Sequence, residues 1–191
     1  MKKFFIFIIV SFLSLSKSYS ETISDLVIEE FSIGQSLLEK FSKNEIDNFF
    51  NYDDLPSSMK FRIYEIYNNK ELSMNTYDAM QFYTKLKTVN TYTWVERIII
   101  CKSEKLCKKK YNEIVSDIKN SYPNSEIQEG QDIHIDDPSG ESTYVGVSVK
   151  LSGGSITVLF TDWSKKVKYT DNVSVEISTN EVSSWIQNNF F

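Results

Sequence analysis

Residues 94–122 constrain the fold more than any other part of the chain, because a strand-like run there passes directly into the clearest helical pattern. Residues 94–101 are mostly β-branched or aromatic, which favours a strand. Apolar side chains then recur at helical spacing until a proline ends the pattern (Cys107, Tyr111, Ile114, Val115, Ile118 and Tyr122). This stripe predicts an amphipathic helix docked on a sheet, with about 1.5–3 kcal/mol from each large buried side chain.

The chain has two cysteines, Cys101 and Cys107, and both lie at this junction between strand and helix. In an oxidising compartment an isolated pair at this spacing predicts a disulfide, which closes a small loop and contributes about 2–2.5 kcal/mol. A redox-active pair is the functional alternative, although such pairs usually have two intervening residues. Two free thiols are the third possibility. The pair alone does not complete a four-ligand zinc site.

The first twenty residues predict a signal peptide. Two lysines precede an apolar run over residues 4–15, and small residues precede a cleavage site after Ser20. The run is shorter than the roughly 20 residues that span a bilayer, although a retained anchor is the alternative reading. We therefore expect residues 1–20 to be removed and residues 21–191 to form a single exported domain without a transmembrane segment. A periplasmic or secreted location follows.

The charge of the expected mature chain argues against nucleic acid as a partner. Losing three lysines with the signal peptide leaves 18 basic against 26 acidic side chains, a net charge of −8. Phosphate neutralisation by lysine and arginine supplies most nucleic-acid affinity, and the chain has only Arg62 and Arg97 as guanidinium donors. We expect an unknown protein or small ligand of the cell envelope as the partner instead.

The order of patterns predicts an α+β domain with an antiparallel sheet of about six strands in two three-strand runs. Two short N-terminal helices come first, the second opened by a capping box at Ser42 and Glu45. The central amphipathic helix separates the two runs, and a C-terminal helix follows a capping box at Ser178 and Glu181. Strands are expected at 59–67, 77–86, 92–101, 144–151, 156–160 and 173–177, with 74–86 alternatively helical. Residues 126–141 predict an acidic loop with a short strand at 133–135.

That acidic loop holds the single histidine of the chain. On an extended segment, Asp132, His134 and Asp136 would point to the same side and offer mixed oxygen and nitrogen donors to a metal ion. The loop does not match an EF-hand, because its sixth position is Asp137 rather than glycine. The alternative is a solvated acidic loop, and we predict no cofactor.

Signatures of catalysis are incomplete. Ser57 and Lys60 match the S-x-x-K pattern without its usual partner motifs, and Ser148 lies within a strand rather than at a nucleophile elbow. The sequence therefore assigns no catalytic residue. One basic cluster opens the central helix, where it opposes the helix dipole (Lys102, Lys105, Lys108, Lys109 and Lys110). It is either a contact site for an anionic membrane surface or a solvated face.

Three features resemble small exported, periplasmic proteins of low-G+C Gram-negative bacteria: residues 31–38 (FSIGQSLL), residues 161–166 (TDWSKK) and the junction from strand to cysteine-bearing helix. The resemblance covers most of the mature chain and implies export, but it carries no activity and no functional residues. Residues 33–37 are also similar to the start of periplasmic modules that bind other proteins.

These observations predict an exported, non-enzymatic binding or envelope-associated protein. The first alternative is a small envelope enzyme that uses a metal ion at Asp132, His134 and Asp136. The second is contact with an anionic membrane through the basic cluster of residues 102–110.

Overall fold

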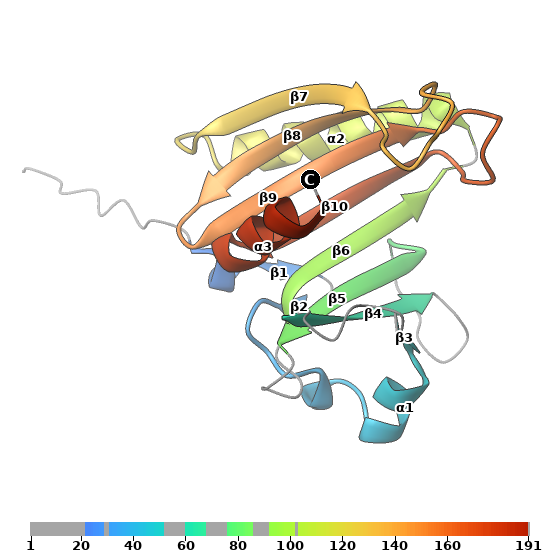
Figure 1. Cartoon of the computed structure of the whole chain (residues 1–191). Coiled ribbons are helices and arrows are strands. Elements are labelled where there is room, and N and C mark those ends of the chain that lie inside the picture. The colour runs from blue at the N-terminus through green and yellow to red at the C-terminus, as the bar shows by residue number, and fades with distance from the viewer. Residues whose placement is uncertain are drawn as a thin grey trace, which may run out of the picture.

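Eight strands form one antiparallel sheet in the computed structural model, which describes residues 22–28, 31–51, 60–67, 76–85, 92–101 and 103–190 (Figure 1). The predicted signal peptide lies outside these residues. Across the sheet the strand order is β3-β4-β5-β6-β10-β9-β8-β7. The strands are β3 (Phe50–Asn51), β4 (Phe61–Tyr67), β5 (Ala79–Lys85), β6 (Tyr92–Ile100), β7 (Ile127–Ile133), β8 (Thr143–Leu151), β9 (Gly154–Asp162) and β10 (Asn172–Thr179).

The α+β class and the antiparallel sheet are confirmed, but the expected two runs of three strands are wrong in detail. The first run, β4 to β6, matches the prediction and is preceded by the two-residue strand β3. The second run has four strands, because residues 127–133 form the edge strand β7 where we expected mostly a loop. Every residue of β7 is exposed, so this strand shows no apolar alternation from which it could be recognised.

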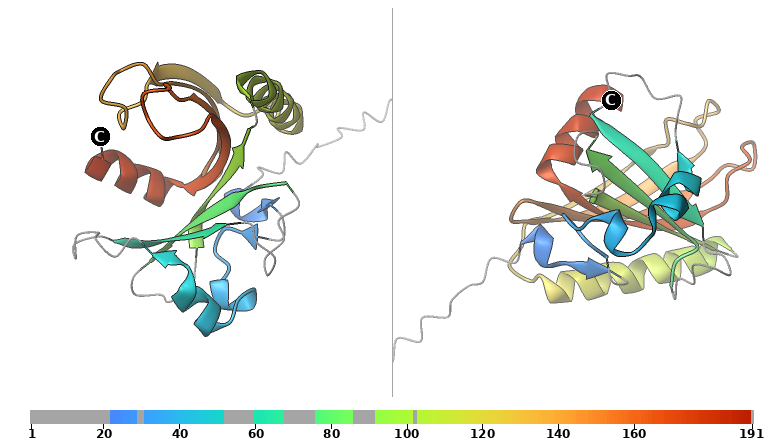
Figure 2. Two further views of the ribbon diagram at one scale, coloured as in Figure 1. Left: turned by 90° about the vertical axis from the view of Figure 1, so that its right-hand side faces the viewer. Right: turned by 90° about the horizontal axis from the view of Figure 1, so that it is seen from below.

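The sheet curls strongly along β7 to β10, and the three α-helices lie on different parts of it (Figure 2). Helix α2 (Glu104–Ser121) lies outside the curl, against β8, β9 and β10. Helix α3 (Asn180–Phe190) lies on the opposite, concave side. The N-terminal segment with α1 (Lys43–Asn48) covers β4 and β5 on the same face as α2, since Tyr77 packs against both apolar clusters there.

Helix α2 forms as the sequence predicts. Its N-terminus is capped by Ser103, whose Oγ accepts a hydrogen bond from the Leu106 N–H (3.4 Å). The predicted stripe, from Cys107 to Tyr122, packs against the inward-pointing valine, isoleucine and phenylalanine side chains of β9 and β10. This contact buries Val158 and Val173 almost completely. The stripe therefore holds α2 on the sheet by burial of apolar surface.

The N-terminal segment is attached to the rest of the domain by a backbone hydrogen bond and a buried side chain. The Ile23 N–H donates to the Ser152 carbonyl oxygen (2.9 Å), and the Ile23 side chain is buried. The expected first helix is only a 3₁₀ turn (Leu37–Glu39), which buries Leu37 and leaves Leu38 exposed. The capping box of α1 is confirmed, with the Ser42 side chain accepting from the backbone of Glu45.

Helix α3 is the expected C-terminal helix, but its cap differs from the prediction. Ser178 is still part of β10, and its hydroxyl bonds that of Ser183. The Thr179 Oγ1 instead accepts from the Val182 N–H (3.3 Å). Glu181 pairs with Lys85 of β5 and with Lys60, directly before β4, rather than with the cap. The apolar side chains of Val182, Trp185 and Ile186 pack against β4 and β5, where they contact the cluster of Phe61, Ile63 and Tyr83.

On the concave side, polar residues occupy one continuous row of register positions across four strands, β7 to β10. Because side chains alternate between the faces of a strand, residues paired across the sheet share a face. Within the row, the Thr157 Oγ1 donates a hydrogen bond to the Ser148 Oγ (3.0 Å). The successive partners from β7 to β10 are Gln128, Ser148, Thr157 and Glu176.

Candidate ligand-binding pocket

The predicted disulfide fixes the head of α2 to the end of β6. Cys101 and Cys107 are bonded, with a Cα–Cα distance of 5.4 Å. Cys107 is fully buried within the cluster between α2 and the sheet. The Cys101 N–H also donates to the Asp171 carbonyl oxygen (3.3 Å), so the start of β10 is tied to the same point. The backbone around the first turns of α2 is therefore held from two sides.

The basic cluster at this helix start does not present one uniform face. Lys108 forms an ion pair with Glu104, and its Nζ lies 5.8 Å from the centre of the Phe160 ring, toward the sheet. Lys109 pairs with Glu113 at 3.8 Å on the solvent side. Lys105 is exposed, Lys110 is half-buried, and Lys102 lies outside the described residues. The described lysines thus divide between two sides of the helix, and two of them have acidic partners.

The proposed metal donors are not brought together. Strand β7 ends at Ile133, and a turn closed by the Asp137 N–H on the His134 carbonyl oxygen (3.1 Å) redirects the chain. Asp136 therefore leaves the side of the strand on which we expected it, although its Oδ2 is 3.8 Å from His134 Nδ1. Asp132 bonds the Ile133 N–H instead. Among the residues that the structure describes, no three His, Cys, Asp or Glu side chains are grouped to hold a metal ion.

The histidine loop is organised by Asp137 and by aromatic packing. The Asp137 carboxylate accepts hydrogen bonds from the Ser142 hydroxyl (2.6 Å), the Ser142 N–H (2.9 Å) and the Ser139 N–H (2.8 Å). These bonds, the Ser142 hydroxyl first among them, hold the pKa of Asp137 well below its usual range. The His134 ring lies 4.2 Å from that of Trp163. The loop is therefore a rigid structural feature.

A pocket of about 300 Å³ opens between the head of α2 and the paired strands β8 and β9. Its walls combine an apolar, partly aromatic surface with a few polar groups contributed by both the helix and the sheet. The lining residues are Lys108, Tyr111, Asn112, Thr143, Val145, Phe160 and Asp162. A small volume, apolar walls and a few converging polar groups are the usual properties of a site for a small molecule.

Asp162 is the most unusual group in this pocket. Burial raises the pKa of its carboxyl, and the neighbouring Asp171 and Glu104 carboxylates raise it further, while Lys108 lowers it. Within the described part of the chain, the Asp162 carboxylate accepts no hydrogen bond and forms no ion pair. A half-buried, unpaired carboxylate with a perturbed pKa is a recognised mark of a functional site.

The fold sets the positions of the two aromatic rings that line the pocket, Phe160 and Tyr111. Phe160 is buried in β9, and the Tyr111 ring lies 6.4 Å from it at an interplanar angle of 49°. Burial, with a contribution from Glu129, raises the pKa of the Tyr111 hydroxyl, so this residue is neutral at physiological pH. Because the stripe of α2 sets the position of Tyr111, the same packing that docks the helix shapes the pocket.

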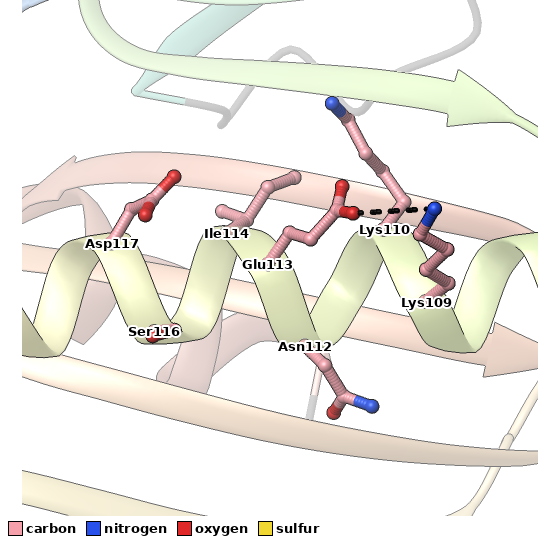
Figure 3. A pocket seen from close by; sticks show the side chains of 7 residues that line it. All are labelled: Lys109, Lys110, Asn112, Glu113, Ile114, Ser116 and Asp117. Atoms are coloured by element: carbon pink, nitrogen blue, oxygen red, sulfur yellow. Dashed lines mark ion pairs between the residues drawn. The ribbon is translucent and has the colours of Figure 1, made fainter.

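A second hollow of about 700 Å³ lies along the outer surface of α2 (Figure 3). All the described residues that line this hollow belong to α2, and most are charged or polar. In the close-up, the Lys109–Glu113 ion pair lies along the helix surface, and the Asn112 side chain points away from this ion pair. No second element contributes a described side chain to this hollow. It is therefore a weaker candidate than the pocket beside Asp162.

Comparison of the chain with protein-family models, with curated proteins and with solved structures finds no match. The pocket must therefore be interpreted from its own chemistry. None of the described helices has the length and apolar character needed to cross a bilayer.

Sequence reasoning found Lys108 but for another reason, and it missed the rest of the pocket. Residues 161–166 were singled out for a resemblance, without a role for Asp162. The available signal was an acidic residue, Asp162, at the end of the apolar strand of Ile156, Val158 and Phe160, with a second acidic residue, Asp171, nine positions later. Only the pairing of β8 with β9 and the docking of α2 bring these residues to one place.

Proposed function

We propose that the protein is an exported, non-enzymatic binding protein of the bacterial cell envelope, and that it binds a small molecule in the pocket between α2, β8 and β9. The observation that carries this proposal is the unpaired, half-buried Asp162 carboxylate in a pocket with aromatic walls. Among the described lining residues, no hydroxyl group is hydrogen-bonded to a base, and the single lysine is paired with Glu104. Its residues therefore suit binding better than catalysis.

Export is supported by the disulfide between Cys101 and Cys107, since such bonds persist mainly in oxidising compartments. The expected signal peptide gives a direct test. Mass spectrometry of the protein purified from the cell envelope should show a chain that begins at Glu21. A chain that retains residues 1–20, or that carries two alkylatable thiols, would contradict export.

Binding is tested with two matched variants of α2. Asn112 lines both the pocket and the outer hollow of α2, and Asn120 lines neither, although both are exposed on the same helix two turns apart; the positions of the shifted amides separate the two sites. We expect Asn112→Trp to obstruct the pocket and abolish binding of fragment-sized aromatic compounds, detected by changes in amide NMR shifts. Asn120→Trp should bind as the native protein does. If both variants bind equally well, or if the native protein binds none of the fragments, the pocket is not a ligand site.

A further inference from the structure

The charges around the pocket are unbalanced. Lys108 is the one cation among the described lining residues, and Glu104 already forms an ion pair with it. Two more carboxylates lie at the same end of β9: Asp162 lines the pocket, and the Asp171 carboxylate accepts from the N–H of the next residue, Trp163. Three negative groups thus surround one positive group.

The two aspartates differ in what they still have to offer a ligand. The Asp171 Oδ1 accepts a hydrogen bond from the Trp163 N–H at 2.9 Å, so this side chain is engaged in holding the chain at the end of β9. Asp162 has no such partner among the described residues, and it lines the pocket. A positively charged group beside Asp162 would offset both the desolvation cost of this carboxylate and its repulsion by Asp171 and Glu104.

The apolar walls favour the same kind of ligand. Aromatic ring faces attract cations, and Phe160 already has the Lys108 ammonium within 5.8 Å of its ring centre. Tyr111 adds a second ring beside it. A volume of about 300 Å³ lies at the lower end of the range of small-molecule sites, which suits a molecule with one ring or a short chain.

We infer that the pocket binds a small organic cation, with the ammonium group of the ligand against the Asp162 carboxylate and its apolar body against Tyr111 and Phe160. This inference rests on the proposed function and adds the class of ligand to it. The cation forms charge-assisted hydrogen bonds with Asp162 and displaces water from the aromatic walls. Anions are repelled by Asp162, Asp171 and Glu104.

Three probes of the same size separate charge from shape: benzylammonium, benzyl alcohol and benzoate. Their dissociation constants are measured by NMR titration of the full mature chain at neutral pH. We expect benzylammonium to bind about tenfold or more tightly than benzyl alcohol, since a hydrogen bond to a charged group contributes about 1.5–3 kcal/mol. Benzoate should bind most weakly of the three.

Two variants that each remove one negative charge serve as the matched pair. Asp162→Asn should abolish the preference for benzylammonium and leave the affinity for benzyl alcohol unchanged. Asp117→Asn, on α2 and outside the pocket, should keep the preference. If the preference for benzylammonium survives Asp162→Asn, or if all three probes bind the native protein equally well, the inference of a cationic ligand is refuted. The pocket then remains a binding site. Failure of every probe to bind would refute both proposals.

Discussion

Reduction of the disulfide gives the most quantitative test of how the fold supports the pocket. The bond joins two cysteines with a sequence separation of six, so it closes a short loop. Loop-closure entropy for a loop of this size corresponds to about 2–2.5 kcal/mol. For a domain of 150–250 residues, each kcal/mol shifts the melting temperature by about 2–4 °C. We therefore expect reduction to lower the melting temperature by about 4–10 °C.

The assay compares the oxidised protein with the same protein kept in a phosphine reductant, using thermal unfolding followed by circular dichroism. Because the side chains are identical in both samples, the difference reports the cross-link alone. The Cys101→Ala/Cys107→Ala variant is the control, and the reductant should not change its melting temperature. This variant should unfold at a slightly lower temperature than the reduced protein, since the Cys107 side chain is fully buried.

A local effect should accompany the global one. The disulfide holds the first turns of α2, which include Lys108 and Tyr111, against the end of β6. Amide hydrogen exchange should therefore accelerate in these turns on reduction and stay nearly constant in α3. If the oxidised and reduced proteins unfold at the same temperature, the account of the cross-link is wrong. If α2 and α3 respond equally, the disulfide does not act on the pocket through α2.

Three further predictions concern stability. Asp162→Asn should raise the melting temperature at pH 7, because burial and like-charged neighbours raise the pKa of this carboxyl and make its ionised form unfavourable in the folded state. The gain should vanish below pH 3.8, where the carboxyl is protonated in both the folded and the unfolded state. A constant gain across the pH range would contradict this. Gly154→Ala should lower the free energy of unfolding in urea by about 1–3 kcal/mol, since its Cβ would lie 2.1 Å from a backbone oxygen of β10. Gly130→Ala is the control, because a Cβ there meets nothing within 4 Å, and it should change the same free energy by less than about 0.5 kcal/mol. Equal effects of the two substitutions would refute the close approach of Gly154 to β10. Phe61→Ala should lower the free energy of unfolding by about 3–5 kcal/mol, because the ring is only 1% exposed. Leu106→Ala, at a residue that is 50% exposed, should lower it by less than about 0.5 kcal/mol. A small loss for Phe61→Ala would mean that α3 does not depend on this packing.

The parts of the fold that sequence predicts are those with a strong apolar signal. The stripe of α2 repeats at helical spacing, and the hairpin of β8 and β9 alternates around a glycine turn, so both were expected where they lie. Strand β7 was missed because Ile127–Ile133 is exposed along its whole length; it is held by backbone pairing with β8 and by an ion pair between Glu129 and Lys119 of α2. An edge strand of this kind leaves no periodic pattern.

The candidate site was harder to predict because its residues are far apart in the chain. Lys108 and Tyr111 come from α2, Thr143 from the start of β8, and Asp162 from the end of β9. Short-range motifs drew attention to His134 instead, where a turn after β7 separates the expected donors. What makes Asp162 notable is burial without a partner, and that property exists only once the helix is docked on the sheet.

The most direct test of the central proposal is an amide chemical-shift map of the mature protein titrated with benzylammonium. The account predicts that the shifted amides cluster around the pocket, at Tyr111, Thr143 and Asp162, and that the map is lost in Asn112→Trp but kept in Asn120→Trp. Shifts confined to the outer surface of α2 or to the polar row of the concave face, or no saturable shifts at all, would contradict it.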